Sequence, residues 1–194
     1  MTLLRRSCTL LLAALLGACT SMRIVDSEVR SFGAATLVAA PATYQLQRLP
    51  SQQDAAFEPV VQAVSRAMAA RGLHSVDQSP QSLLTVSWSQ REWPRAPWES
   101  ESTPFFGHFW MGTAGSGGGV GMRFPALDVP WYERRLGLVL RDTNTGEVVF
   151  ETQAQHDGRW RDTEAVLPAM LEAALHNYPG GHPQTQTISI EIPR

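Results

Sequence analysis

The fold is decided by residues 131–160, which read WYERRLGLVLRDTNTGEVVFETQAQHDGRW. Apolar side chains alternate along the first half of this stretch and again along the second half. One face of the first half carries Tyr132, Leu136, Leu138 and Leu140, with Arg134 as the exception. The matching face of the second half carries Val148, Phe150 and Ala154. Asn144 and Gly146 tolerate the positive φ of a tight turn. Two adjacent runs with a period of two predict an antiparallel hairpin.

Two amphipathic helices are predicted outside this hairpin, because apolar residues recur there at i, i+3, i+4 and i+7. The first helix has Asp54 as its N-cap and ends near Gly72. The second is capped by Asp162 or Thr163 and ends at residues 179–181. The apolar positions of the first are Phe57, Val60, Val61, Val64, Ala67 and Met68. Those of the second are Leu167, Met170, Leu171, Ala174, Leu175 and Tyr178.

Further strands are predicted at residues 27–32, 43–48, 83–89 and 185–192. The order along the chain favours an α+β fold, with a largely antiparallel sheet and two helices packed on one face. Removal of residues 1–18 would leave 194 − 18 = 176 residues, a length typical of one domain. We expect that domain to span residues 27–194, with a Gly- and aromatic-rich insertion at about 91–130.

The N-terminus has the features of a lipoprotein signal peptide. Arg5 and Arg6 precede an apolar run at residues 10–16, which is shorter than the ~20 residues that span a bilayer. The run closes with Leu16-Gly17-Ala18-Cys19, which resembles a lipobox. The sequence therefore predicts cleavage between Ala18 and Cys19, lipid on Cys19 and a tether at 19–26. An ordinary signal peptide, in which Cys19 stands by chance, is the alternative.

The residue after the cysteine bears on location. An Asp at that place often resembles an inner-membrane retention signal, and here the residue is Thr20. We therefore expect an outer-membrane lipoprotein that faces the periplasm, with the inner membrane as the alternative.

Composition excludes several classes of protein. The formal net charge of −2 gives no broad basic field for nucleic acid. Of the two cysteines, Cys8 lies in the removed segment and Cys19 would carry lipid, so we expect no disulfide, thiolate metal site or catalytic thiol. The five histidines form no i, i+4 pair. We expect no metal and no cofactor beyond the covalent lipid.

Several stretches together resemble one known family of bacterial envelope lipoproteins, the domain of unknown function family 4136. They are the lipobox, Thr43-Tyr44, residues 70–73, residues 83–88, the run LGLVLRDTNTGEVVF at 136–150, and Asn177-Tyr178-Pro179. The resemblance covers most of the mature chain and implies a fold and a location. It implies no activity, because the family has none established.

The insertion holds the candidate contact residues. Its aromatic side chains could touch a partner or a membrane, or could fold back over the sheet. The residues predicted for such contact are Trp98, Phe105, Phe106, Phe109 and Trp110. The glycine run at 112–121 lacks the Lys-Ser or Lys-Thr of a phosphate loop and is interpreted as a plain loop.

No catalytic residues are predicted. Glu92, Glu99 and Glu101 lie close in sequence, but acid and base roles need a fixed separation. The leading hypothesis is a non-catalytic interaction or assembly factor, bound to the membrane by its lipid and to an envelope protein. One alternative is a periplasmic carrier of an apolar ligand, held between sheet and helices. Another is a hydrolase of envelope polymers.

Overall fold

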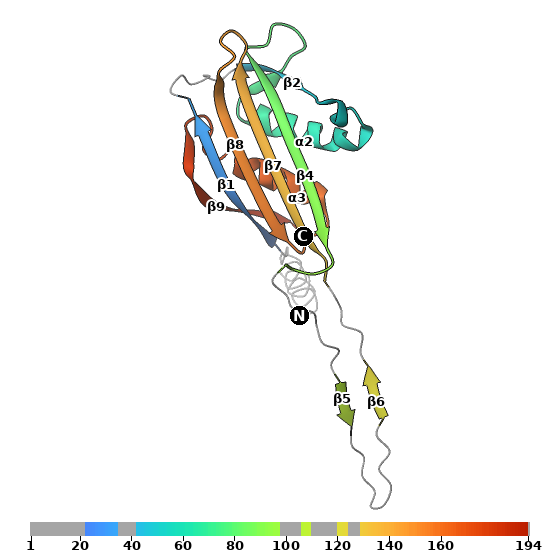
Figure 1. The fold of residues 1–194 in the computed structure, drawn as a ribbon. Helices are drawn as coiled ribbons and strands as arrows, with labels where there is room; N and C mark the ends of the chain where they lie inside the picture. The colour runs from blue at the N-terminus through green and yellow to red at the C-terminus, as the bar shows by residue number, and fades with distance from the viewer. Residues whose placement is uncertain (1–21, 35–41, 98–105, 110–119, 124–128, 194) are drawn as a thin grey trace, which may run out of the picture.

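The predicted hairpin lies at the centre of a seven-stranded sheet (Figure 1), in a computed structural model that describes residues 22–34, 42–97, 106–109, 120–123 and 129–193. Strands β7 (Trp131–Asp142) and β8 (Val148–Gly158) pair antiparallel. The Asp142 carboxylate accepts hydrogen bonds from the backbone N–H groups of Asn144, at 2.7 Å, and Thr145, at 2.9 Å. The bonds from Thr145 and then Asn144 lower the pKa of Asp142. The turn is thus closed by its own side chain.

The sheet has the strand order β3-β2-β4-β7-β8-β1-β9. Strands β1 (Met22–Gly33), β4 (Ser82–Trp93) and β9 (Gly181–Pro193) join the hairpin in antiparallel register. Strand β2 (Ala42–Gln47) instead runs parallel to β4 and to β3 (Leu73–Ser75). The sheet is therefore mostly, but not wholly, antiparallel. Alternation at 43–48 identifies a strand there but carries no information on its direction.

Several predicted boundaries were wrong. The predicted tether at 19–26 is too long, because β1 begins at Met22, which pairs with Pro193 of β9. The fully buried side chain of Val25 holds this part of the strand in the core. Strand β4 continues to Trp93, which pairs with Trp131, so the insertion predicted at about 91–130 lies between these two residues. Met22 and Ile24 are exposed on β1, and Arg91 and Glu92 are exposed on β4. Neither strand end therefore shows the buried apolar alternation that marks the centre of its strand.

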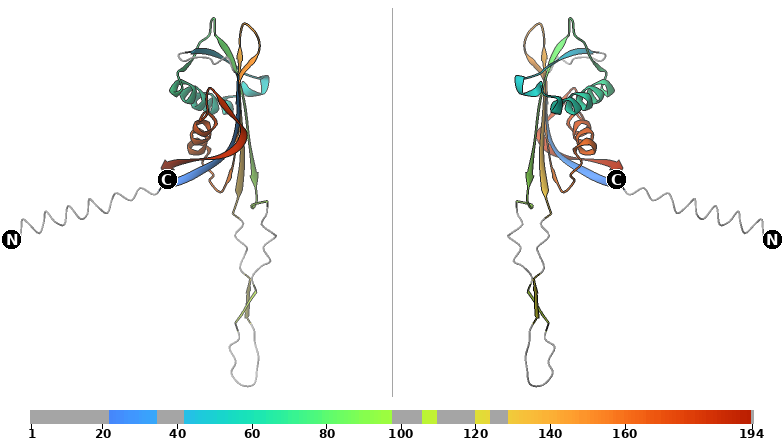
Figure 2. Two further views of the ribbon diagram at one scale, coloured as in Figure 1. Left: turned by 90° about the vertical axis from the view of Figure 1, so that its left-hand side faces the viewer. Right: turned by 90° about the vertical axis from the view of Figure 1, so that its right-hand side faces the viewer.

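Both helices pack on one face of the sheet and leave the other face open (Figure 2). Helix α2 (Glu58–Ala70) is preceded by two short 3-10 helices, η1 (Pro50–Gln52) and η2 (Ala55–Phe57). The predicted cap Asp54 accepts the N–H of Ala56, so it caps η2 rather than α2. Beyond the helix, Gly72 adopts a φ of 79°. The predicted end of the helix is confirmed.

Helix α3 (Thr163–Ala174) is buried almost all round, because it contacts the sheet, α2 and β9. Asp162 occupies its N-cap position but makes no side-chain cap bond. The core between sheet and helices consists mainly of aliphatic side chains. Its fully buried members include Val25, Val29, Val64, Leu73, Leu84, Leu138, Leu140, Met170, Leu171 and Leu175. The buried positions of both predicted stripes face this layer. Helix α3, however, ends at Ala174 rather than at the predicted residues 179–181, so Tyr178 lies beyond the helix.

Candidate functional site: the basal end of the sheet

One end of the sheet concentrates the polar and aromatic features of the domain. There β1 begins at Met22, β7 begins at Trp131, β4 ends at Trp93 and β8 ends at Gly158. We call this the basal end. Cys19, the predicted lipid site, and Ala18, the predicted cleavage residue, lie outside the described residues. In the sequence Cys19 stands three residues before Met22. A lipid on Cys19 would therefore attach at the basal end.

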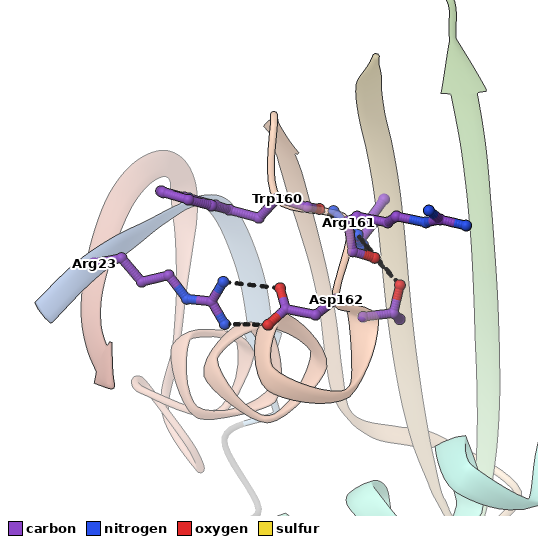
Figure 3. A network of polar contacts seen from close by, with 6 residues as sticks. Arg23, Trp160, Arg161 and Asp162 are labelled. Carbon is purple, nitrogen blue, oxygen red and sulfur yellow. Dashed lines mark hydrogen bonds and ion pairs between the residues drawn. The ribbon is translucent and has the colours of Figure 1, made fainter. Parts of the chain in front are cut away.

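An ion pair ties the start of β1 to the start of α3 (Figure 3). The Arg23 guanidinium donates to the Asp162 carboxylate at 2.9 Å and 2.5 Å. Arg23 also lies over the ring of Trp160, with 5.2 Å between guanidinium carbon and ring centroid. The hydrogen bonds from Arg23 hold the pKa of Asp162 below its usual range. This two-pronged geometry fixes the loop after β8 against the first strand.

Arg134, the exception in the hairpin pattern, is fully buried on β7. Its Nη2 donates to the carbonyl oxygens of Trp160, at 2.7 Å, and Arg161, at 3.3 Å. It also donates to Thr163 Oγ1 at 3.2 Å, and that hydroxyl donates to Gln90 Oε1 on β4 at 2.6 Å. Burial lowers the pKa of Arg134, and the Asp162 charge partly offsets this. The buried guanidinium thus holds the loop that leads into α3.

His156 is the cross-strand neighbour of Arg134 and is 4% exposed. Its Nδ1 lies 2.7 Å from the Asp26 carbonyl oxygen. A carbonyl can only accept, so Nδ1 carries the proton. Nε2 is buried and finds no partner among the described residues. Burial, reinforced by the charge of Arg134, lowers the pKa of His156 from its ordinary 6.5. The fold therefore favours the neutral imidazole.

This arrangement predicts a pH-dependent stability. Below pH ~6.5 His156 is more fully protonated in the unfolded chain than in the folded domain, because folding lowers its pKa. The free energy of unfolding should therefore fall as the pH falls, by at most about 1.4 kcal/mol per pH unit. We expect His156→Asn, whose amide can still donate to Asp26, to flatten this part of the profile. The measurement is the free energy of unfolding in urea between pH 5 and pH 8. An unaltered slope in His156→Asn, or an equal flattening in the exposed His74→Asn control, would contradict the assignment.

The basal network offers little for catalysis. Arg134 and His156 are both withdrawn from solvent, and each donates a hydrogen bond to a backbone carbonyl oxygen. The Glu92 carboxylate accepts a bond from the Tyr132 hydroxyl at 3.4 Å, while Glu99 and Glu101 lie outside the described residues. The described part of the chain holds no cluster of three or more metal-ligating side chains. The predicted absence of a catalytic centre stays a prediction.

Two hollows lie on outer surfaces of the domain. One, of about 580 Å³, opens on the helix-free face of the sheet around Gly137. A Cβ on Gly137 would lie 2.4 Å from Ser87 Oγ, a side-chain atom that would have to rotate aside. Its lining is mixed and includes Glu28, Arg135, Gln153 and Gln155. The other, of about 490 Å³, lies between α2 and α3. Buried aliphatic side chains of the described residues occupy the layer between sheet and helices, and neither of these two hollows lies there.

Two of the five predicted aromatic contact residues fall within the described part of the chain. Phe106 and Phe109 belong to β5 (Phe106–Phe109), which pairs antiparallel with β6 (Val120–Arg123) in a separate two-stranded ladder. Trp98, Phe105 and Trp110 lie outside the described residues. The chain leaves the domain after β4 and returns to β7, so the insertion starts and finishes at the basal end. The sequence did not show that the insertion leaves the sheet at the end where β1 begins, because this depends on the direction in which the strands run.

Comparison with known proteins places the chain in a family. The family model described as "Domain of unknown function (DUF4136)" matches residues 29–180. The chain belongs to the DUF4136 family. The predicted family is thereby confirmed, whereas the lipoprotein anchor stays a prediction. The matched DUF4136 segment runs from within β1 to the residue before β9. Among curated proteins, no sequence matches this DUF4136 chain.

Solved structures resemble the DUF4136 domain at low sequence identity. A PDZ domain protein from Parabacteroides distasonis matches with a TM-score of 0.52 and 10% identity, over 89% of this chain and 39% of that one. The DUF4136 chain thus spans well under half of that protein. Two crystal forms of the PelC dodecamer from Paraburkholderia phytofirmans match at 12% and 11% identity, with TM-scores of 0.43 and 0.46. They cover 77% and 79% of this chain, and 94% and 99% of theirs. Only the match to the PDZ domain protein, with a TM-score above 0.5, supports a similarity of fold.

Proposed function

We propose that this protein is a lipid-anchored envelope protein, held on the outer membrane through Cys19, and that it acts there as a non-catalytic interaction or assembly factor. One observation carries the proposal. The first strand begins three residues after Cys19, and three residues reach at most ~11 Å. An acylated Cys19 would hold the basal end directly at the membrane surface. Neither described helix has the length and apolarity to cross a bilayer itself.

The open sheet face supports the interaction role. An anchor at the basal end leaves this face, with its hollow around Gly137, standing free beside the membrane. Side chains there can form both hydrogen bonds and ion pairs, since Arg135 and Glu151 border the same hollow as Gln153. Such a mixed surface suits a protein partner better than an apolar ligand.

The test uses a variant of the protein in which a photo-crosslinking amino acid replaces Gln153. This variant is produced in cells and extracted from their membranes. Without irradiation, we expect an intact mass that begins at Cys19 and includes added acyl chains. Cys19→Ala should lose both the acyl mass and the membrane fraction, whereas the matched control Cys8→Ala should lose neither. An unmodified chain in the soluble fraction would contradict the anchor.

Irradiation then tests the interaction role with the same preparation. We expect one discrete protein adduct from position 153 and none from position 62, which lies on α2 away from the open face. Equal labelling at both positions, or adducts with lipid alone, would contradict a partner on this face. Recovery of a cleaved envelope polymer fragment would favour the hydrolase instead.

A further inference from the structure

The basal end also concentrates exposed apolar side chains. Five large hydrophobic residues in the described chain are markedly exposed. Three of them are basal: Met22 at 51%, Ile24 at 54% and Val129 at 42%. The others lie elsewhere, with Phe32 (39% exposed) near the far end of β1 and Leu49 (51% exposed) just before η1. Exposed hydrophobic residues are ordinary when scattered, but three at the same end of a sheet indicate a contact surface. Met22 and Ile24 lie at the start of β1, which turns toward the helix side, and Val129 lies just before β7 (Figure 2).

Two tryptophans complete this group. Trp93 and Trp131 are paired across the last register position of β4 and β7, and both are half-buried. The Trp93 indole N–H donates to the Glu133 carboxylate at 3.4 Å, and Arg91 lies 5.2 Å from its ring centroid. A side chain with an apolar body and a bonded polar tip is typical of the boundary between membrane and water. We call Met22, Ile24, Trp93, Val129 and Trp131 the basal rim.

We infer that the basal rim is a membrane-contact surface, which rests in the headgroup region of a phospholipid bilayer and orients the domain on its anchor. The inference rests on the proposed lipid anchor. A bilayer has an interfacial layer of roughly 5–8 Å on each side of its hydrocarbon core. A lipid on Cys19 leaves ~11 Å of chain before Met22. Met22 and Ile24 therefore cannot stand far from that layer, and lipid is the occupant that the tether brings to this end of the sheet.

Charge supports apolar rather than electrostatic contact. Exposed residues of both signs flank the rim, as Arg91 and Glu92 on β4 and as Arg161 and Asp162 after β8. They form no one-signed field that would demand anionic lipid. The contact should then form on phosphatidylcholine, which is zwitterionic and has no net charge, and salt should weaken it little.

The test attaches a single hexadecyl chain to the thiol of Cys19, the only cysteine in residues 19–194. One chain gives marginal, reversible membrane binding, so a contribution from the rim can be measured. We expect Met22→Ser/Ile24→Ser/Val129→Ser to lower the partition coefficient onto phosphatidylcholine vesicles roughly tenfold. Ile24→Ser alone should lower it, whereas Leu49→Ser, a site of nearly equal exposure, should not. Partitioning should be unchanged between low and high salt.

Each other outcome overturns the inference. Equal partitioning of Ile24→Ser and Leu49→Ser would mean that the basal rim does not contact the membrane. Loss of self-association in the rim variant, seen by sedimentation, would assign the rim to a second copy of the chain. A steep loss with salt would replace apolar contact with electrostatic attraction. Circular dichroism checks the triple variant; if it is unfolded, the single-site comparison decides. Because the acyl chain is attached chemically, failure of the rim is distinguishable from failure of Cys19 acylation in the cell.

Discussion

Replacing Arg134 with Met should lower the free energy of unfolding by about 3 kcal/mol. Met preserves much of the apolar stem but removes every donor. The carbonyl oxygens of Trp160 and Arg161 would then lose the bonds that Arg134 makes to them. Each buried polar group left unpaired costs about 1–3 kcal/mol. For a domain with a typical stability of ~5–15 kcal/mol this is a large fraction. Equilibrium unfolding in urea measures the change.

The next residue provides the control. Arg135 follows Arg134 on the same strand, but it points to the open face, with its side chain 63% exposed and paired with Glu133. Arg135→Met should change stability by no more than about 0.5 kcal/mol, since exposed ion pairs contribute little. A wild-type stability for Arg134→Met would mean that the buried guanidinium is not what holds the loop before α3, since buried charged groups can be replaced by apolar ones without loss in some proteins.

The second large effect is expected at Gly181, where β9 begins beside the end of β1. Its φ is 74°, a conformation that L residues rarely adopt. A Cβ there would also lie 2.4 Å from the Gly33 nitrogen and 2.7 Å from the Phe32 carbonyl carbon. Both atoms are backbone and cannot turn aside. We expect Gly181→Ala to cost at least about 3 kcal/mol, from left-handed strain of about 1–2 kcal/mol and overpacking of about 1–3 kcal/mol.

Gly146 separates these two contributions. It has nearly the same φ, 73°, but no atom lies within 4 Å of its added Cβ. Gly146→Ala should therefore cost only the conformational strain, about 1 kcal/mol. Thermal or urea unfolding of both variants gives the comparison. If both substitutions cost the same, the close approach of β9 to β1 at Gly181 is not a real constraint.

Some of the candidate site could be seen in the sequence. Arg134 interrupts an otherwise apolar face, and a charge in such a place predicts either an error in the pattern or a buried group with partners. Its partners could not be predicted, because Trp160, Arg161 and Thr163 lie more than 25 residues further along and meet it only when β8 folds back. Arg23 and His156 gave no local signal at all. Each is an ordinary polar residue in a strand until β1 pairs with β8.

The basal rim, too, could not be predicted from the sequence, because its residues are far apart along the chain. Met22 and Ile24 lie about a hundred residues from Val129, and no sequence pattern connects them. They share one end of the molecule because β1 and β7 run in the same direction on either side of β8. The chain was expected to be a tether until residue 26, so two of the rim residues were placed outside the domain. Strand direction, rather than residue type, brings these residues to the end of the sheet at which β1 begins.

The sequence by itself determined the elements of this protein: the hairpin, both helices, the family and the predicted acylation site. These depend on periodicity and on motifs, which are local and can be seen in a few consecutive residues. Only the tertiary structure decided the parallel placement of β2, the early start of β1, the buried Arg134–His156 pair, and the meeting of rim and insertion at one end. Those features depend on which strands become neighbours. That choice is made by the burial of whole faces at once, so no short stretch of sequence contains it.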